Sequence, residues 1–82
     1  MYSVYIIYSP FKNVFYKGCT SNLENRLLKH NSGASNYTSS VSDWQLVYSK
    51  VYETKTEALR EEKRLKKLNR SSLERLIQNK NP

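Results

Sequence analysis

Cysteine is nearly absent from this chain, with one residue among 82. A single cysteine can form no internal disulfide and cannot build a cysteine-rich zinc site, and this usage fits a reducing compartment. Long apolar runs are also missing, and the opening residues Met1–Tyr5 contain no basic segment of the kind that begins a secretion signal. We therefore expect a soluble, cytoplasmic protein that has no membrane partner.

Acidic side chains are scarce, because seven of them stand against fourteen lysines and arginines, for a formal net charge of +7. On so short a chain this excess favours a polyanionic partner, with nucleic acid ahead of an anionic membrane surface. The length suits one small domain with little stability to spare. We find no internal repeat and no low-complexity tract.

A strand signal, a glycine and a helix signal follow one another in the first half of the chain. The aromatic and β-branched run Val14–Cys19 favours a strand, and Gly18 within it allows a bend or a close approach. Ser21 and Glu24 have the S-x-x-E spacing of a capping box, which predicts a helix over residues 22–31. The expected unit is strand, tight turn and helix.

This unit places three polar side chains around one corner. Arg26 and His30 are four residues apart on the predicted helix and share a face, while Tyr16 lies on the preceding strand. Leu23 and Leu27 form the apolar stripe of the helix, with Arg26 and His30 at its edge. A phenol, a guanidinium and an imidazole at one concavity are suited to handling phosphate.

The first residues predict a partner for this strand. Tyr2–Tyr8 is rich in aromatic and β-branched residues, and the short loop of residues 9–13 favours an antiparallel hairpin. Pairing can bring Tyr5 and Tyr16 onto the same face, although the loop length leaves the register open. Polar residues 32–43 form a long connection that can include a helical turn near its middle.

The second half of the chain predicts one strand and two helices. Gln45–Tyr52 alternates, with Leu46 and Tyr48 on one face and Val47 on the other. Two capping boxes follow, and they are formed by Thr54 with Glu57, before a helix reaching about Leu68, and by Ser71 with Glu74, before a closing helix. The predicted fold is α/β of the α+β type, a small three-stranded, mainly antiparallel sheet flanked by helices. One domain covers residues 1–78, and residues 79–82 form a frayed tail.

Glu62 interrupts an apolar stripe on the first of these late helices, between Ala58 and Leu65. A carboxylate there is costly to bury unless it meets a cation, a donor or a metal ion. Two roles for Glu62 are consistent with the sequence: a salt bridge to a neighbouring basic side chain, and a ligand in a metal site. Asn69, on the same stripe, could support a substrate or cap a helix end.

The ordered set of these residues resembles the GIY-YIG nuclease domain, and in particular its small stand-alone members. Tyr16-Lys17-Gly18 resembles the YIG motif, with Arg26 and His30 eight and twelve residues beyond the glycine. Ser3-Val4-Tyr5 stands where GIY falls. The resemblance continues through Asn31-Ser32-Gly33, Tyr37-Thr38 and Trp44–Tyr48 to a late-helix glutamate. Ser3 replaces the glycine of GIY, and Lys17 replaces the isoleucine of YIG.

The resemblance implies a metal-dependent endonuclease that hydrolyses phosphodiester bonds in DNA. Glu62, in an A-x-x-x-E context, would hold Mg²⁺ or Mn²⁺, which a single carboxylate with waters and phosphate oxygens suits. Tyr16 would accept a proton from water, and Tyr5 would orient the water or the phosphate. Arg26 would stabilise the phosphate charge, and His30 would transfer a proton or bind the scissile phosphate. Taken singly, Tyr16, Arg26 and His30 also have ordinary readings, as a sheet aromatic, a solvated charge and a residue favoured by the helix dipole.

Basic residues run along the late helix beside the expected site. Such a run is a solvated face or a surface that follows a phosphate backbone without reading sequence. Our candidates for nucleic-acid binding are Lys17, Lys63, Lys66, Lys67, Asn69 and Arg70. Cys19 stands where some family members carry a basic residue that helps to polarise the tyrosine.

Two other functions remain open. One is a catalytically weak nucleic-acid-binding module that uses the same basic and aromatic surface. The other is a small basic protein-interaction adaptor, for which the polar 32–43 connection is the expected contact. If the chain is a nuclease, its targeting would come from DNA structure, from a protein partner or from a homodimer, and DNA repair or recombination is the role we assign to it.

Overall fold

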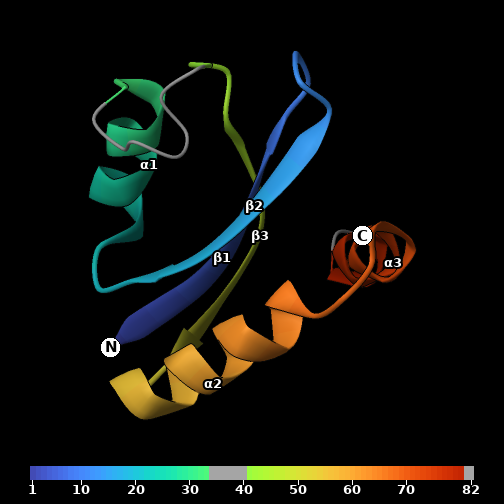
Figure 1. Ribbon diagram of the computed structural model, residues 1–82. Coiled ribbons are helices and arrows are strands. Elements are labelled where there is room, and N and C mark those ends of the chain that lie inside the picture. The colour runs from blue at the N-terminus through green and yellow to red at the C-terminus, as the bar shows by residue number, and fades with distance from the viewer. Residues whose placement is uncertain (34–40, 81–82) are drawn as a thin grey trace.

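The computed structural model describes residues 1–33 and 41–80, which form one sheet and three helices (Figure 1). The elements in chain order are β1 (Tyr2–Ser9), β2 (Val14–Thr20), α1 (Leu23–Asn31), β3 (Gln45–Tyr52), α2 (Lys55–Lys66) and α3 (Arg70–Lys80). The α+β class and the three-stranded antiparallel sheet are confirmed. The helical turn expected near the middle of residues 32–43 lies outside the described residues. Helix α3 includes residues 79 and 80, where we expected a frayed tail.

Strand β1 lies in the centre of the sheet, whose order is β2-β1-β3. Because it has a neighbour on both sides, its residues 4–7 are at most 1% exposed. In the β1–β2 register Tyr5 pairs with Gly18 and Ile7 with Tyr16. Since paired residues share a face, Tyr5 and Tyr16 lie on the same side of the sheet, which is the arrangement that the sequence allowed while leaving the register open.

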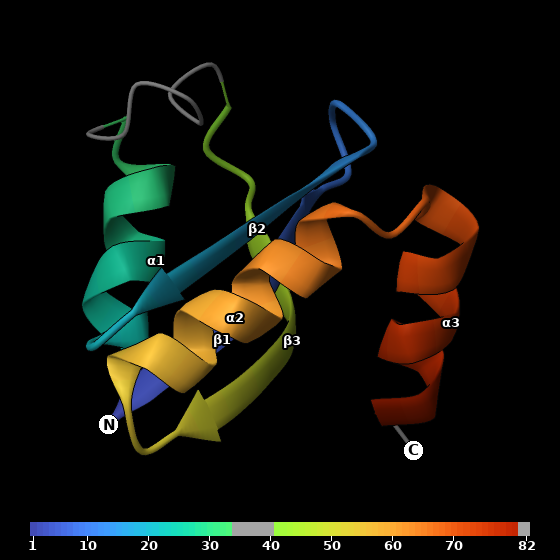
Figure 2. The ribbon, with the colours of Figure 1, turned by 60° about the horizontal axis from the view of Figure 1, so that its bottom comes forward.

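Helices cover both faces of the sheet, with α1 on one side and α2 and α3 on the other (Figures 1 and 2). On the α1 side Tyr5, Ile7 and Trp44 form a buried cluster, against which Leu23 and Leu27 pack. On the opposite side the cluster consists of Val4, Ile6, Tyr48, Ala58, Leu65 and Leu73. The alternation along β1 therefore supplies both cores. Within the described ranges, no helix is long and apolar enough to cross a membrane.

A β-bulge in β3 breaks the alternation that the sequence predicted. Ile6 pairs with Tyr48, but Ile7 pairs with Leu46, so Val47 is an extra residue in this strand. Leu46 and Tyr48 consequently face opposite sides of the sheet. The prediction that they share a face was wrong, because a strict period of two cannot anticipate an inserted residue.

Helix α1 begins at Leu23, one residue later than predicted, because its N-cap also lies one residue later. The Asn22 side chain accepts a hydrogen bond from the N–H of Asn25 (3.1 Å), so Asn22, and not Ser21 with Glu24, is the N-cap. The Thr20 hydroxyl accepts a hydrogen bond from the Asn22 N–H (3.1 Å), which fixes the approach to the helix. Asn and Ser are similarly good caps, so neighbouring candidates compete and the chain geometry decides between them.

The other two helices give one confirmed cap and one correction. Thr54 caps α2 as predicted and accepts from the N–H of Glu57. Asn69 accepts from the N–H of Ser72 (2.8 Å) and thereby caps α3, whereas the box beginning at Ser71 was predicted. Of the two roles considered for Asn69, the structure shows the helix cap.

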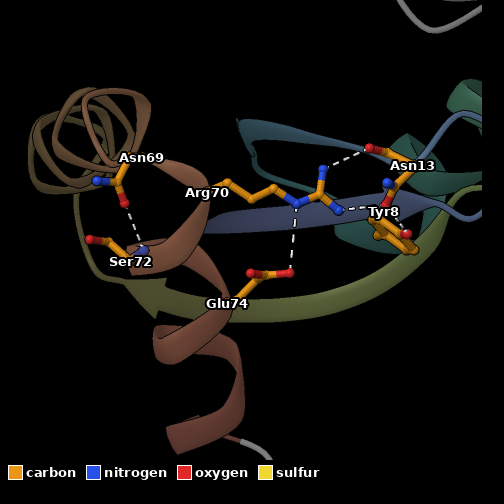
Figure 3. A network of polar contacts seen from close by, with 6 residues as sticks. All are labelled: Tyr8, Asn13, Asn69, Arg70, Ser72 and Glu74. Carbon is orange, nitrogen blue, oxygen red and sulfur yellow. Dashed lines mark hydrogen bonds and ion pairs between the residues drawn. The ribbon is translucent and has the colours of Figure 1, made fainter.

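Arg70 joins the start of α3 to the β1–β2 loop (Figure 3). Its Nη1 donates to the carbonyl of Asn13 (2.8 Å) and its Nη2 to the Asn13 side chain (2.5 Å). The same guanidinium lies over the Phe15 ring at 5.1 Å and approaches Glu74 at 3.6 Å. We expected Arg70 in the phosphate-binding run, but its side chain is engaged within the protein.

Candidate active site at the edge of strand β2

Tyr5 reaches the sheet edge by passing over Gly18. It starts from the central strand, and Gly18 is its partner on the edge strand. A Cβ atom added at Gly18 would lie 2.5 Å from Tyr5 Cζ, which is closer than real side chains approach. The absence of a side chain at Gly18 therefore lets the phenol of a buried strand extend to the edge of β2.

His30 forms a buried hydrogen bond with Tyr5. The Tyr5 hydroxyl and His30 Nε2 are 2.8 Å apart, and His30 is fully buried, whereas we expected it at the edge of the helix stripe. The His30 ring also contacts Tyr16, with ring centroids 5.1 Å apart. Burial and then the charge of Arg26 lower the pKa of His30. The imidazole is therefore neutral near pH 7.

Arg26 interacts with both phenols. The pKa of its guanidinium is raised first by a hydrogen bond with Tyr5 and also by interaction with Tyr16. Arginine can only donate, so Tyr5 can act toward Arg26 only as an acceptor, and its own proton can be directed to His30 Nε2 in the tautomer that leaves this nitrogen unprotonated. Burial outweighs Arg26 and raises the pKa of Tyr5, which keeps this phenol protonated. Arg26 Nε is buried and has no hydrogen-bond partner among the described residues.

Tyr16 is held by aromatic neighbours at the opening of the site. Its ring contacts Trp44 edge-on, with centroids 6.5 Å apart. Asn31 fixes the Trp44 backbone, accepting from the Trp44 N–H (2.8 Å) and donating to its carbonyl (3.1 Å). In the sequence, Asn31 and Trp44 stand out only as part of the family resemblance. Their hydrogen bonds were not predicted, because a contact across 13 positions leaves no local signal.

Glu62 approaches β2 from α2, on the other side of the sheet. Ala58 and Leu65 on its stripe are fully buried, and the Glu62 side chain is 18% exposed. Helix α2 packs against β2, and the charge of Glu62 contributes to raising the pKa of Cys19 and, as the smallest contribution, the pKa of Tyr5. Glu62 also lies 3.8 Å from Lys66 Nζ, so the simpler reading, an ion pair, is present. In the described part of the chain, no group of three or more His, Cys, Asp or Glu could hold a metal ion.

Cys19 faces the α2 side of the sheet and packs against the core there. Burial first, and then the charge of Glu62, raise the pKa of its thiol, which therefore stays protonated. Tyr16 lies on the opposite face, because its partner Ile7 and the Cys19 partner Val4 alternate along β1. Cys19 is thus a neighbour of Glu62 more than of Tyr16, the tyrosine that a basic residue at this position polarises in some family members.

Two open pockets, one bordered by β2 and α2 and the other by α2 alone, are lined by most of the predicted basic residues. The first, of about 380 Å³, is lined by Phe15, Tyr16, Lys17 and Lys66. The second, of about 390 Å³, is lined by Thr56, Leu59, Arg60, Glu62 and Lys63. Lys67 is exposed at the C-cap of α2. The β2 edge therefore combines two phenols, a guanidinium and a carboxylate with lysines on both sides.

Comparison with known proteins identifies the family of this chain. The model of the GIY-YIG catalytic domain matches residues 1–79. The chain belongs to the GIY-YIG family. Its fold is therefore of the nuclease type, and the resemblance found in the sequence is confirmed.

Small UPF0213 proteins are among the relatives. The chain is 38% identical over 63 residues to one from Staphylococcus saprophyticus, covering 76% of this chain and 77% of the relative. It is 32% identical over 78 residues to one from Halobacterium salinarum, covering 94% and 100%. The solution structure of a UPF0213 protein from Bacillus halodurans superposes with a TM-score of 0.64 at 33% identity, covering 98% of this chain and 86% of the other.

Proposed function

We propose that this GIY-YIG protein is a metal-dependent endonuclease that hydrolyses phosphodiester bonds in DNA. The observation that carries the proposal is the convergence of Tyr5, Tyr16, Arg26 and Glu62 on the β2 edge, from four different elements and from both faces of the sheet. Nothing in the packing of either core requires a guanidinium held between two phenols. Such a group is suited to the charge that develops on a phosphate under attack.

Each side chain has a distinct part in this mechanism. Arg26 faces the phosphate oxygens and stabilises their charge, and its place between two phenols limits the geometries that it can adopt. Tyr16, at the opening of a pocket, accepts a proton from the attacking water. Tyr5 stays protonated and orients the reacting group as a hydrogen-bond partner. His30 is buried, so its role is to position Tyr5 rather than to touch the phosphate.

The side chains of the site fit a hard divalent cation that brings most of its own ligands. Glu62 is an accessible carboxylate at this edge, and Mg²⁺ is commonly held by one or two carboxylates with waters and substrate phosphates. Glu62 would hold Mg²⁺ or Mn²⁺ in competition with Lys66. Such a cation supplies neutralisation of the charge on the phosphate and the leaving oxygen.

DNA would be bound mainly through its phosphates. Lys17 and Lys66 border the pocket beside Tyr16, and Lys63 borders the one beside Glu62. Lys67 adds charge at the end of the same helix. This arrangement follows a backbone and reads no base sequence. Selection of DNA structures in repair or recombination, a protein or homodimer partner, and a cytoplasmic location stay predictions.

The decisive experiment is a cleavage assay with Mg²⁺ or Mn²⁺ on single-stranded, duplex, flap and branched DNA. We expect Glu62→Gln and Tyr16→Phe to lower the rate by about 10²- to 10³-fold while DNA binding persists, because each removes one group acting on the reacting atoms. Glu53→Gln and Tyr2→Phe are the matched controls, since they make the same chemical changes outside the site. Both should cleave as the wild type does.

Cleavage that survives Glu62→Gln would remove the metal role. Binding without cleavage by wild type and variants alike would favour a catalytically weak binding module instead. The Glu62–Lys66 ion pair supports this second candidate, because a carboxylate already paired has less to offer a metal ion. Absence of any salt-sensitive DNA affinity would favour the protein-interaction adaptor.

A further inference from the structure

The tip of the β1–β2 hairpin presents an exposed aromatic side chain. Phe11 is 75% exposed, whereas every other aromatic residue in the described ranges is buried or half-buried. Lys12, beside it, is also exposed. Figures 1 and 2 both show this loop extending away from the N-terminal end of the sheet. A phenylalanine at such a position contributes little to either hydrophobic core.

The backbone of the tip is nevertheless fixed by hydrogen bonds. The Phe11 N–H donates to Asp43 Oδ2 (2.9 Å), the Lys12 N–H to the Ser9 hydroxyl (3.2 Å) and the Asn13 N–H to the Ser9 carbonyl (2.7 Å). Every N–H group of the loop is thus bonded, because Pro10 has none. The Phe11 side chain is therefore presented from a preorganised backbone.

Two further contacts hold the loop from the other side (Figure 3). The Tyr8 hydroxyl donates to Asn13 Oδ1 (2.5 Å), and Arg70 donates to both oxygens of Asn13. Asn13 has a φ of 58°, which is a left-handed conformation that asparagine tolerates better than most residues. The tip is therefore tied to β1, to α3 and to the residue preceding Trp44.

A pocket of about 300 Å³ opens beside Phe11 and is also lined by Val41, Ser42 and Asp43. Hydrogen bonds from the Ser9 hydroxyl and then from the Phe11 N–H lower the pKa of Asp43, so its carboxylate is ionised at neutral pH. A negative charge at this place repels phosphate, while the aromatic ring offers a stacking face. The chemistry beside Phe11 thus suits a nucleobase, and that of Lys12 suits a phosphate.

We propose that the hairpin tip binds an unpaired nucleobase of single-stranded DNA, which stacks on Phe11 while Lys12 contacts the adjacent backbone. The inference rests on the proposed function, because it takes DNA as the partner. Phe11 precedes Tyr16 by five positions in the same hairpin, so the base would belong to the strand that reaches the β2 edge. A paired base cannot expose its face to Phe11 without unstacking, so the tip favours unpaired strands.

The test uses oligonucleotides that carry 2-aminopurine, with affinity measured without divalent metal so that no strand is cut. We expect Phe11→Ala to bind the single strand about tenfold more weakly than wild type and to leave affinity for the matched duplex unchanged. Wild type should quench 2-aminopurine by stacking, and Phe11→Ala should not. Phe11→Trp should retain affinity and quenching, whereas Phe11→Leu, which is apolar but has no aromatic face, should lose both.

Leu28→Ala is the matched control, because Leu28 is a 66% exposed apolar residue on α1 outside the site. It should bind as the wild type does, and thermal unfolding should show that all variants fold. Unchanged single-strand affinity in Phe11→Ala, or an equal loss for single strand and duplex, would overturn the stacking contact.

The same variants separate failure of this inference from failure of the nuclease proposal. If wild type cleaves, Glu62→Gln does not, and Phe11→Ala binds normally, the endonuclease stands and the base contact falls. If Glu62→Gln cleaves as wild type does while Phe11→Ala loses single-strand affinity, the base contact stands and the proposed metal role falls.

Discussion

Tyr5 and His30 form a buried pair whose protonation is set by its surroundings. The Tyr5 hydroxyl and His30 Nε2 are 2.8 Å apart, Arg26 interacts with Tyr5, and burial lowers the pKa of His30 so that the imidazole is neutral. A second positive charge beside Arg26 would be unfavourable in this place. The orientation of Tyr5 at the sheet edge therefore depends on a histidine that no solvent reaches.

This pair predicts a dependence of stability on pH. The pKa of His30 is lowered in the folded protein, so the unfolded chain binds more protons once the pH falls below about 6.5. The free energy of unfolding should be unaffected by this group well above that value and should decrease as the pH falls through it. His30 is the single histidine of the chain, so its effect can be isolated.

The measurement is urea unfolding of wild type and His30→Gln between pH 8 and pH 5. Glutamine keeps a hydrogen-bonding side chain but does not titrate. We expect His30→Gln to be less stable at pH 8 and to lose less stability than wild type on acidification. Equal losses in the two proteins would show that another group titrates.

Residue types and short spacings were the part of the site that the sequence could predict. Arg26 and His30 are one helical turn apart, and the shared face of Tyr5 and Tyr16 follows from strand pairing. The burial of His30 could not be predicted in the same way, because it depends on how far the helix packs onto the sheet. The Asn31 clamp on Trp44 depends likewise on two segments meeting in space.

At the scale of elements, the start of α3 is anchored to the β1–β2 loop through its first residue, in addition to the packing of Leu73 in the core. Arg70 reaches across to the hairpin loop, stacks on Phe15 and donates twice to Asn13 (Figure 3). Phe15 in turn lines the pocket that contains Tyr16. The helix therefore supports one wall of the candidate site without contributing a side chain to it.

Arg70→Ala should lower the free energy of unfolding by about 1–2 kcal/mol, through loss of the hydrogen bonds to Asn13 and of the stacking on Phe15. Arg70→Lys should recover only part of this, because a lysine lacks the planar fork. Arg75→Ala, which removes the same exposed charge further along α3, is the control. If Arg75→Ala destabilises the protein as much as Arg70→Ala does, the anchoring role is wrong. Thermal or urea unfolding supplies the measurement.

Helix ends and strand faces show how much of the structure could be predicted from local sequence patterns. The cap of α2 was predicted correctly, but the N-caps of α1 and α3 are asparagines one and two residues away from the predicted serines. Several polar residues near a helix start can all accept its free N–H groups, so the local pattern is degenerate. The bulge at Val47 is a feature of pairing with β1 and has no signal within β3 itself.

For the whole molecule, the excess positive charge is distributed unevenly around the sheet. Lysines line the pockets beside Tyr16 and Glu62 at the β2 edge. Along α2, Arg64 is instead bound by Glu61 at 2.6 Å, which lowers the pKa of that carboxyl. Across the sheet, Lys50 lies over the Tyr52 ring at 5.5 Å. Several of the basic residues behind the net charge of +7 therefore line the pockets beside Tyr16 and Glu62.

This distribution predicts which lysines contribute to the salt dependence of DNA binding. Lys63→Ala and Lys67→Ala should each reduce the slope of log affinity against log salt concentration by about 1, because each removes a phosphate contact. Lys50→Ala makes the same change in net charge on the opposite edge strand and should leave the slope unchanged. A similar reduction in all three variants would mean that net charge alone, without a preferred edge, governs binding.

The sequence by itself determined the elements, the two faces of β1, the basic character and the residue types of the candidate site. These follow from periodicities and spacings that act over a few residues. Tertiary structure alone decided that Glu62 reaches from the far face to the edge where Tyr16 and Arg26 lie, and that Arg70 is used within the protein. Both outcomes depend on strand register and on helix packing, in which contacts between distant segments set the energy. The conformational preferences of short sequence segments do not specify those contacts.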